Sequence, residues 1–150
     1  MAIKHKAGSV VKIELESGEF CFAHVLKDPL IAFYDLKVKE IPPINVLINS
    51  PILFKVWVMK YAVTSGRWPI IGQSPLTEEL RAPVTFFKQS PMNDNLFLYR
   101  NSEIQDGPVS AGDCEGLERA AVWDPEHIED RLRDHFLGVP NKWVESLKIK

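Results

Sequence analysis

One stretch of the chain, residues 52–61, constrains the fold more than any other. It reads ILFKVWVMKY, and both alternating sets of side chains are apolar except for Lys55. A strand that is wet on one face alternates apolar and polar residues, whereas a strand covered on both faces is apolar throughout. We therefore predict a central strand over residues 52–61 with packing on both faces. Its middle residues are expected to pack and not to recognise a partner: Val56, Trp57 and Val58.

The residues on either side of this stretch predict further antiparallel strands. An alternating first strand spans residues 9–16, the turn Ser17-Gly18-Glu19 follows, and a second strand returns over residues 20–27. Pro69 supplies no amide hydrogen, so the strand around it should be at an edge or broken. The other strand candidates are short and separated by turns: residues 30–36, 67–73, 86–89 and 96–100.

The strongest helix pattern lies near the C-terminus. Asp124 is a good N-cap because its carboxylate accepts hydrogen bonds from free amides of the first turn, and Pro125 suits the first helical position. Gly138 can end the helix, and Glu129 and Arg133 are spaced to pair on its wet side. Apolar residues recur every four positions and form one stripe: Ile128, Leu132 and Phe136.

Together these elements predict an α+β fold. We expect a bent antiparallel sheet or partly closed β-barrel of about six or seven strands, with a C-terminal helix at residues 124–137 packed on it. A chain of 150 residues suits one domain with a single core. No linker or internal repeat divides it, so residues 1–150 should form one domain, with a core at about 8–137 and a C-terminal arm at 138–150.

Charge and hydropathy exclude some classes of function. The net charge of −2 does not fit a strongly basic chain that binds phosphates, so no nucleic-acid partner is expected. No apolar run of about 18 residues is present, and the N-terminal residues lack the apolar core of a signal peptide. We therefore expect a cytoplasmic protein without a membrane partner.

No arrangement of residues in the sequence predicts catalysis or a bound cofactor. Cys21 and Cys114 lack metal-binding spacing, and the common nucleophile and phosphate-binding motifs are absent. His127 and His135 would lie about 80° apart around the predicted helix, so they do not form a zinc-binding pair. We expect no catalytic residue, no metal and no cofactor.

Two features are candidates for a protein interface. Residues 103–118 hold five acidic residues, three Gly and one Pro, without Lys or Arg. This composition is typical of a solvated loop, and it also suits a surface that steers a basic partner by electrostatic complementarity. The acidic candidates are Asp106, Asp113, Glu115 and Glu118. Arg67 and Trp68 are candidates for an aromatic and cationic contact surface. The alternative is an edge strand in which Trp68 packs inward and Arg67 pairs with an acid.

Six short blocks along the chain together resemble one protein family. They are DPLIAFYD at residues 28–35, PILF at 51–54, SGRW at 65–68, FFKQ at 86–89, CEGLE at 114–118 and AVWDPEHIEDRL at 121–132. Their order and spacing resemble the bacterial immunity protein 26 family over roughly residues 8–136.

This resemblance implies a function. The family is associated with polymorphic toxin and contact-dependent growth inhibition systems, in which an immunity protein binds and neutralises its cognate toxin, as in other toxin–antitoxin pairs. The resemblance implies that this chain is a non-enzymatic inhibitor. It would form a heterodimer with a bacterial toxin domain, for example a nuclease, in the cytosol. The family offers no catalytic motif and no agreed toxin-binding residues to transfer. The oligomeric state of the chain is left open.

Two functions of other classes are alternatives. One is a small-ligand or peptide-binding module with a pocket at the mouth of the barrel, lined by aromatic side chains such as Trp57, Tyr34 and Trp68. The other is a hydrolase that uses His24 or His127. It would require a buried histidine–carboxylate pair inside a cleft.

Overall fold

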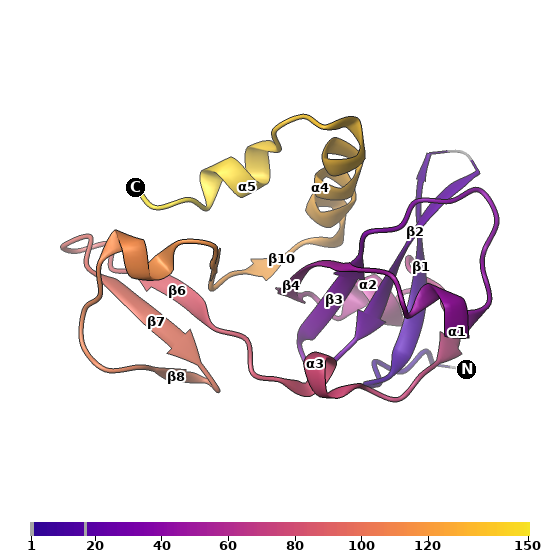
Figure 1. Cartoon of the computed structure of the whole chain (residues 1–150), viewed down its shortest axis with the longest axis horizontal. Coiled ribbons are helices and arrows are strands. Elements are labelled where there is room, and N and C mark those ends of the chain that lie inside the picture. The colour runs from indigo at the N-terminus through magenta and orange to yellow at the C-terminus, as the bar shows by residue number, and fades with distance from the viewer. Residues whose placement is uncertain (1, 17) are drawn as a thin grey trace.

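Two β-sheets and a C-terminal pair of helices are the main parts of the fold among the described residues (Figure 1). A computed structural model describes residues 2–16 and 18–150, so Ser17 of the predicted first turn lies outside the described residues. Within these ranges, six strands form the first sheet in the order β10-β4-β3-β2-β1-β5. Their bounds are β1 Ser9–Glu16, β2 Glu19–Val25, β3 Leu30–Tyr34, β4 Ile52–Val58, β5 Ile70–Gln73 and β10 Val122–Trp123.

A smaller sheet lies beside the first, on the left in Figure 1, and its described strands follow the order β8-β7-β6-β9. They are β6 Phe86–Gln89, β7 Leu96–Arg100, β8 Glu103–Ile104 and β9 Glu118–Arg119. The helices are α1 Ile44–Leu47, α2 Tyr61–Thr64, α3 Glu78–Arg81, α4 Pro125–Leu137, α5 Lys142–Ser146 and the 3₁₀ turn η1 Ala111–Cys114. In the part of the chain that the structure describes, no helix has the length and apolarity to cross a bilayer.

The predicted α+β class, with a C-terminal helix packed on a sheet, is confirmed. Of the two predicted forms, the structure has the bent sheet and not the partly closed barrel, because the first sheet is open and has β10 and β5 at its two edges. The single sheet of six or seven strands is also wrong, because β6 and β7 pair with each other in the second sheet. Each sheet contains one parallel pair, β10 with β4 and β9 with β6.

Strand β4 is covered on both faces, as its apolar sequence predicts. Val56 and Val58 are fully buried in the core under α4. On the other face, the ring of Trp57 lies 4.6 Å from that of Phe86 and 5.5 Å from that of Tyr99, centroid to centroid. The strand is shorter than predicted, and it lies beside the edge strand β10 and not at the centre of the sheet. Trp57 therefore packs against the second sheet.

The main core lies between the first sheet and α4. The predicted apolar stripe faces the sheet, and Ile128 and Leu132 are fully buried there with side chains such as Ile13 and Phe33. Full burial of one such side chain contributes roughly 1.5–3 kcal/mol relative to exposure. A second apolar cluster, which includes Leu47 of α1, covers the opposite face of the sheet.

Both ends of α4 match the prediction. Asp124 Oδ1 accepts a hydrogen bond from the backbone N–H of Glu126 at 3.1 Å, and Pro125 occupies the first helical turn. Gly138 after the last turn has a φ of 70°. This left-handed conformation suits glycine, which has no Cβ to clash with the backbone.

Residues 118–123 join the two sheets. They contain β9, which pairs in parallel with β6, and β10, which pairs in parallel with β4. Further backbone hydrogen bonds run from Ala120 N to Phe87 O at 2.8 Å and from Met59 N to Trp123 O at 3.0 Å. Because α4 begins directly after this stretch, both sheets determine where the helix lies.

The C-terminal arm is docked on the second sheet, near which Figure 1 shows the C-terminus. Arg119 of β9 donates a hydrogen bond from Nε to the carbonyl of Leu147 at 2.8 Å. Gln89 of β6 accepts one from the backbone N–H of Lys150 at 3.0 Å. The arm therefore packs as part of the fold.

Candidate functional site

The residues that the sequence nominates for an interface come from two parts of the fold. Four acidic residues lie on the second sheet or the segment between β8 and β9: Asp106, Asp113, Glu115 and Glu118. The other two, Arg67 and Trp68, lie between α2 and β5, beside the first sheet. Helix α4 contacts members of both groups, and these contacts decide which side chains can reach a partner.

Trp68 has no exposed surface. Its Nε1 donates a hydrogen bond to Oε2 of Glu129 at 2.9 Å. Arg67 donates to the same carboxylate from Nε at 2.9 Å and from Nη2 at 2.8 Å. The side chain of Glu129 is 10% exposed, and a buried carboxylate is stable only with such partners. A contact role for Trp68 is therefore wrong. The structure has the alternative arrangement, with Trp68 inward and Arg67 paired.

Sequence reasoning missed the role of Glu129. The predicted pair with Arg133 is wrong, because Arg133 instead pairs with Asp130 at 3.2 Å and donates to the carbonyl of Leu15 at 3.0 Å. A signal was present, since Glu129 lies three residues before the buried Leu132 and so shares the apolar face of the helix. The hydrogen bonds to Glu129 raise the pKa of the Arg67 guanidinium above its ordinary value.

A second ion pair holds Glu118. Arg131 of α4 donates from Nη1 and Nη2 to the two carboxylate oxygens of Glu118, at 2.9 Å each. The guanidinium also lies 3.6 Å from the ring centroid of Phe54, over its face. Planar, bidentate and stacked contacts of this kind are those that arginine makes best. Glu118 is therefore engaged within the fold.

The two ion pairs lie on opposite sides of α4. Glu129 and Arg131 are two residues apart, which corresponds to about 200° around a helix. Glu129 binds the segment after α2, beside the first sheet, and Arg131 binds β9 of the second sheet. Arg67, Trp68 and Glu118 thus contribute to the placement of α4.

The remaining acidic candidates differ in how they are held. Asp113 Oδ2 accepts hydrogen bonds from the backbone N–H and the hydroxyl of Ser110, at 3.0 Å each, and so caps η1. Asp106, Glu115 and the neighbouring Glu103 are exposed. Among residues 2–16 and 18–150, no cation lies within ion-pair distance of these three carboxylates. They are available to a partner.

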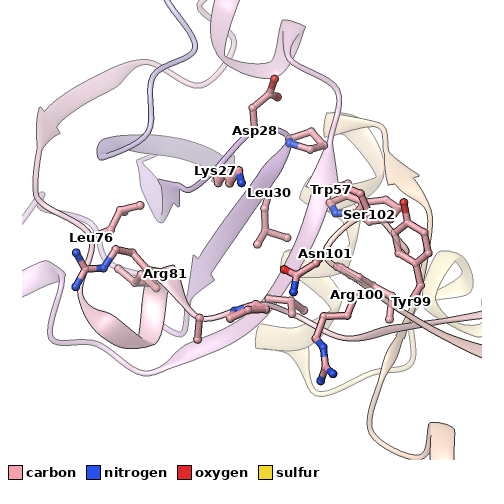
Figure 2. Close-up of a pocket in the computed structure, with 16 residues that line it drawn as sticks. Lys27, Asp28, Leu30, Trp57, Leu76, Arg81, Tyr99, Arg100, Asn101 and Ser102 are labelled. Atoms are coloured by element: carbon pink, nitrogen blue, oxygen red, sulfur yellow. The ribbon is translucent and has the colours of Figure 1, made fainter. Parts of the chain in front are cut away.

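A pocket of about 610 Å³ lies between the two sheets (Figure 2). We call it the inter-sheet pocket. Leu30 and Trp57 of the first sheet line it together with Phe86 and Tyr99 of the second, and α3 contributes Leu80. Its volume falls in the range of known ligand sites. Of the three aromatic residues that the sequence proposed for a pocket, Trp57 lines it, whereas Tyr34 and Trp68 do not.

The buried His24 is not arranged as a catalytic base. Its Nε2 lies 3.0 Å from the carbonyl oxygen of Ser74, and its Nδ1 lies 2.8 Å from the hydroxyl of Tyr34. A carbonyl can only accept, so Nε2 carries the proton and Nδ1 accepts from the hydroxyl. Burial lowers the pKa of His24 and raises that of Tyr34 to about 12, so both stay neutral at pH 7. Among the described residues no carboxylate hydrogen-bonds to His24, so the pair that a hydrolase needs is not formed there.

His127 and His135 of α4 each contact another side chain. His127 stacks on the indole of Trp143, with ring centroids 3.5 Å apart. His135 contacts Asp35 at 3.1 Å, but both side chains are 41% exposed and lie at the surface. In the described part of the chain, no group of three or more histidine, cysteine or acidic side chains could hold a metal ion.

Comparison with known protein families gives a match. The family described as immunity protein 26 matches residues 6–98, well over half of the chain. No curated protein and no solved structure matches the chain. The matched range runs from the residues before β1 into β7, and it stops before the acidic segment and α4. On this match, the chain belongs to the immunity protein 26 family.

Proposed function

We propose that this protein binds a cognate bacterial toxin in the cytoplasm and neutralises it as a non-enzymatic inhibitor. The family match over residues 6–98 is the observation that carries this proposal. The proposal places the protein in a contact-dependent growth inhibition system or a related toxin–antitoxin pair. Its partner is the toxin, in a heterodimer, and neither nucleic acid nor a membrane is a partner.

The chemistry of the side chains supports binding over catalysis. Both ring nitrogens of His24 are satisfied by neutral groups. The buried carboxylate of Glu129 is fully occupied by Arg67 and Trp68. A stoichiometric inhibitor needs a stiff scaffold and exposed recognition residues, and loops are where such residues tend to lie.

We infer that the acidic segment, residues 103–118, contacts the toxin. Asp106 and Glu115 are exposed and lack an ion-pair partner within the described residues, and Asp113 fixes the local backbone through the capping box that it forms with Ser110. A toxin that cleaves nucleic acid has a basic cleft, and an acidic surface is electrostatically complementary to it. The side chain of Arg67, 38% exposed beside Glu129, is a secondary contact candidate.

Co-expression tests this proposal. The toxin encoded next to this protein is expressed in bacteria alone, with this protein, or with an unrelated protein of similar size as the control. Rescue of growth only by this protein, together with a co-purifying complex of one copy each by light scattering, is the expected result. Continued toxicity and no complex with a catalytically inactive toxin would overturn the proposal.

A further inference from the structure

The inter-sheet pocket has an apolar floor and a basic rim. Lys27, Arg81 and Arg100 line it alongside its leucine and aromatic side chains. Figure 2 shows Leu30 in the middle of the pocket, with the three cationic side chains on different sides of it. This arrangement, an apolar centre within a charged border, is the usual anatomy of a protein-binding surface.

The rim cations are outside the ion pairs that the described residues form. Within the part of the chain that the structure describes, none of Lys27, Arg81 and Arg100 forms an ion pair. The acid in the lining, Asp28, is already paired with Lys60 at 2.7 Å. The pocket is therefore positive around its apolar floor, in a protein whose net charge is −2.

The walls of the pocket are held in place by contacts of their own. Lys55 of β4 donates from Nζ to the carbonyl of Glu79 at 2.7 Å, which fixes α3 against the first sheet. On the other side, Asn101 and Ser102 form the β7–β8 turn with φ values of 53° and 64°. Gln105 supports this turn by donating to the carbonyl of Arg100 at 3.1 Å. A pre-formed pocket loses little freedom when it is filled.

The spread of the cations favours a protein segment over a small anion. A site for a small anion brings its donors together at one point, whereas these come from the β2–β3 turn, α3 and the end of β7. Their heads do not converge in Figure 2. The pocket fits a bulky apolar side chain on the floor, with acidic residues on either side of it that meet the rim.

We propose that the inter-sheet pocket receives an apolar anchor residue of the toxin that is flanked by carboxylates. This inference rests on the proposed function, because it takes the toxin as the occupant. Arg100 and Glu103 are opposite each other in the β7–β8 ladder, so the basic rim and the acidic segment meet at that turn. A surface with both signs of charge in fixed places gives the partner one orientation.

The test compares affinities for catalytically inactive toxin. One variant reverses the rim, Lys27→Glu with Arg81→Glu and Arg100→Glu. A second variant, Ala82→Trp, fills the pocket from an exposed lining position without a change of charge. We expect Kd to rise about 100-fold or more for the first and about 10-fold for the second, as for other central interface contacts.

A matched control separates the rim from net charge. Reversal of three exposed lysines elsewhere on the surface changes the total charge by the same amount: Lys6→Glu, Lys39→Glu and Lys142→Glu. We expect this control to bind within about threefold of the wild type. Urea unfolding checks that all variants are folded. Because Ala82→Trp is independent of charge, it keeps the test decisive if the triple variant is unstable.

Each outcome decides the question. If the wild type binds the toxin and both pocket variants bind as tightly, the pocket is not the docking site, while the proposed function stands. If the wild type itself does not bind, the proposed function and this inference fail together. If sedimentation shows a dimer of this chain that both pocket variants abolish while toxin affinity is unchanged, the occupant is a second copy and the inference is overturned.

Discussion

Arg131 on α4 and Glu118 on β9 are joined by two parallel hydrogen bonds of 2.9 Å. The pair connects the helix that covers the first sheet to an edge strand of the second. The side chain of Arg131 is 13% exposed, and its guanidinium stacks on Phe54. Water therefore screens this pair less than it screens pairs at the surface.

Arg131→Ala should lower the free energy of unfolding by roughly 2–4 kcal/mol, because it leaves the carboxylate of Glu118 unpaired and removes the stacking on Phe54. Arg131→Lys should cost less, since it keeps the charge but loses the bidentate geometry. Urea denaturation measures both. The control is Lys148→Ala, which breaks an exposed pair with Glu145 and should change stability by less than about 1 kcal/mol. Equal effects of Arg131→Ala and the control would contradict this view of α4.

Glu129→Gln tests the buried carboxylate. The amide keeps the shape but leaves Arg67 without its counter-charge, and it cannot accept all of the hydrogen bonds from Arg67 and Trp68. We expect the free energy of unfolding to fall by roughly 2–4 kcal/mol. Urea unfolding monitored by tryptophan fluorescence measures this loss. Glu126→Gln is the matched control, because Glu126 is 68% exposed and 4.0 Å from Arg67. A similar loss in both variants would show that charge alone, and not burial, is responsible.

His24 should make the protein sensitive to acid. Burial lowers its pKa in the folded state below the ordinary value of 6.5, so the unfolded chain takes up the proton first as pH falls. Its contribution to stability is therefore complete above about pH 6.5 and is lost below it, by at most about 1.4 kcal/mol per pH unit. His24→Gln should flatten this slope between pH 7 and 5. His5, whose pKa is lowered in the same direction, makes His5→Gln the comparison that isolates the share of His24.

Reversal of the acidic segment should slow association with the toxin. Asp106→Lys with Glu115→Lys removes two exposed carboxylates and spares the cap made by Asp113. We expect the association rate at low salt to fall about tenfold and its dependence on salt to flatten, in stopped-flow or surface-based kinetics. Glu14→Lys with Glu40→Lys, two exposed acids elsewhere, is the control of equal charge. Unchanged kinetics in the first variant would exclude the segment as a steering surface.

Gly138→Ala isolates a backbone effect. Beyond its two chain neighbours, a Cβ at this position would meet no described residue within 4 Å, and the φ of 70° is left-handed. The expected loss of about 1 kcal/mol in urea unfolding is therefore conformational, without a steric clash. Gly112→Ala, where φ is not left-handed and the nearest atom lies 3.6 Å away, should be near neutral. A loss of stability in Gly112→Ala as large as that in Gly138→Ala would contradict a conformational cause, because Gly112 does not have a left-handed φ.

The sequence predicts the elements whose causes are local. The strands at residues 9–16, 86–89 and 96–100 follow from short apolar runs bounded by turns, and the structure has a strand in each place. Helix α4 follows from a cap, a proline, an apolar stripe and a terminal glycine. These signals act between residues that are neighbours along the chain, so a single sequence contains them.

The missed features depend on residues that are distant along the chain. Strands β9 and β10 have two residues each, too few for any periodicity, and their parallel pairing exists only because β6 and β4 are already in place. The direction of Trp68 is decided by Glu129, 61 positions later. The inter-sheet pocket combines segments from Lys27 to Ser102, and no local pattern brings such segments together.

Residues 118–123 also determine when the two sheets can be completed during synthesis. During synthesis the other strands of both sheets leave the ribosome before this stretch, so β4 and β6 each lack a parallel neighbour until it emerges. A nascent chain therefore leaves Trp57 and Val58 of β4, and Phe86 and Phe87 of β6, open to pairing with another chain. We therefore expect a chain that stops before residue 118 to aggregate more readily than the full chain.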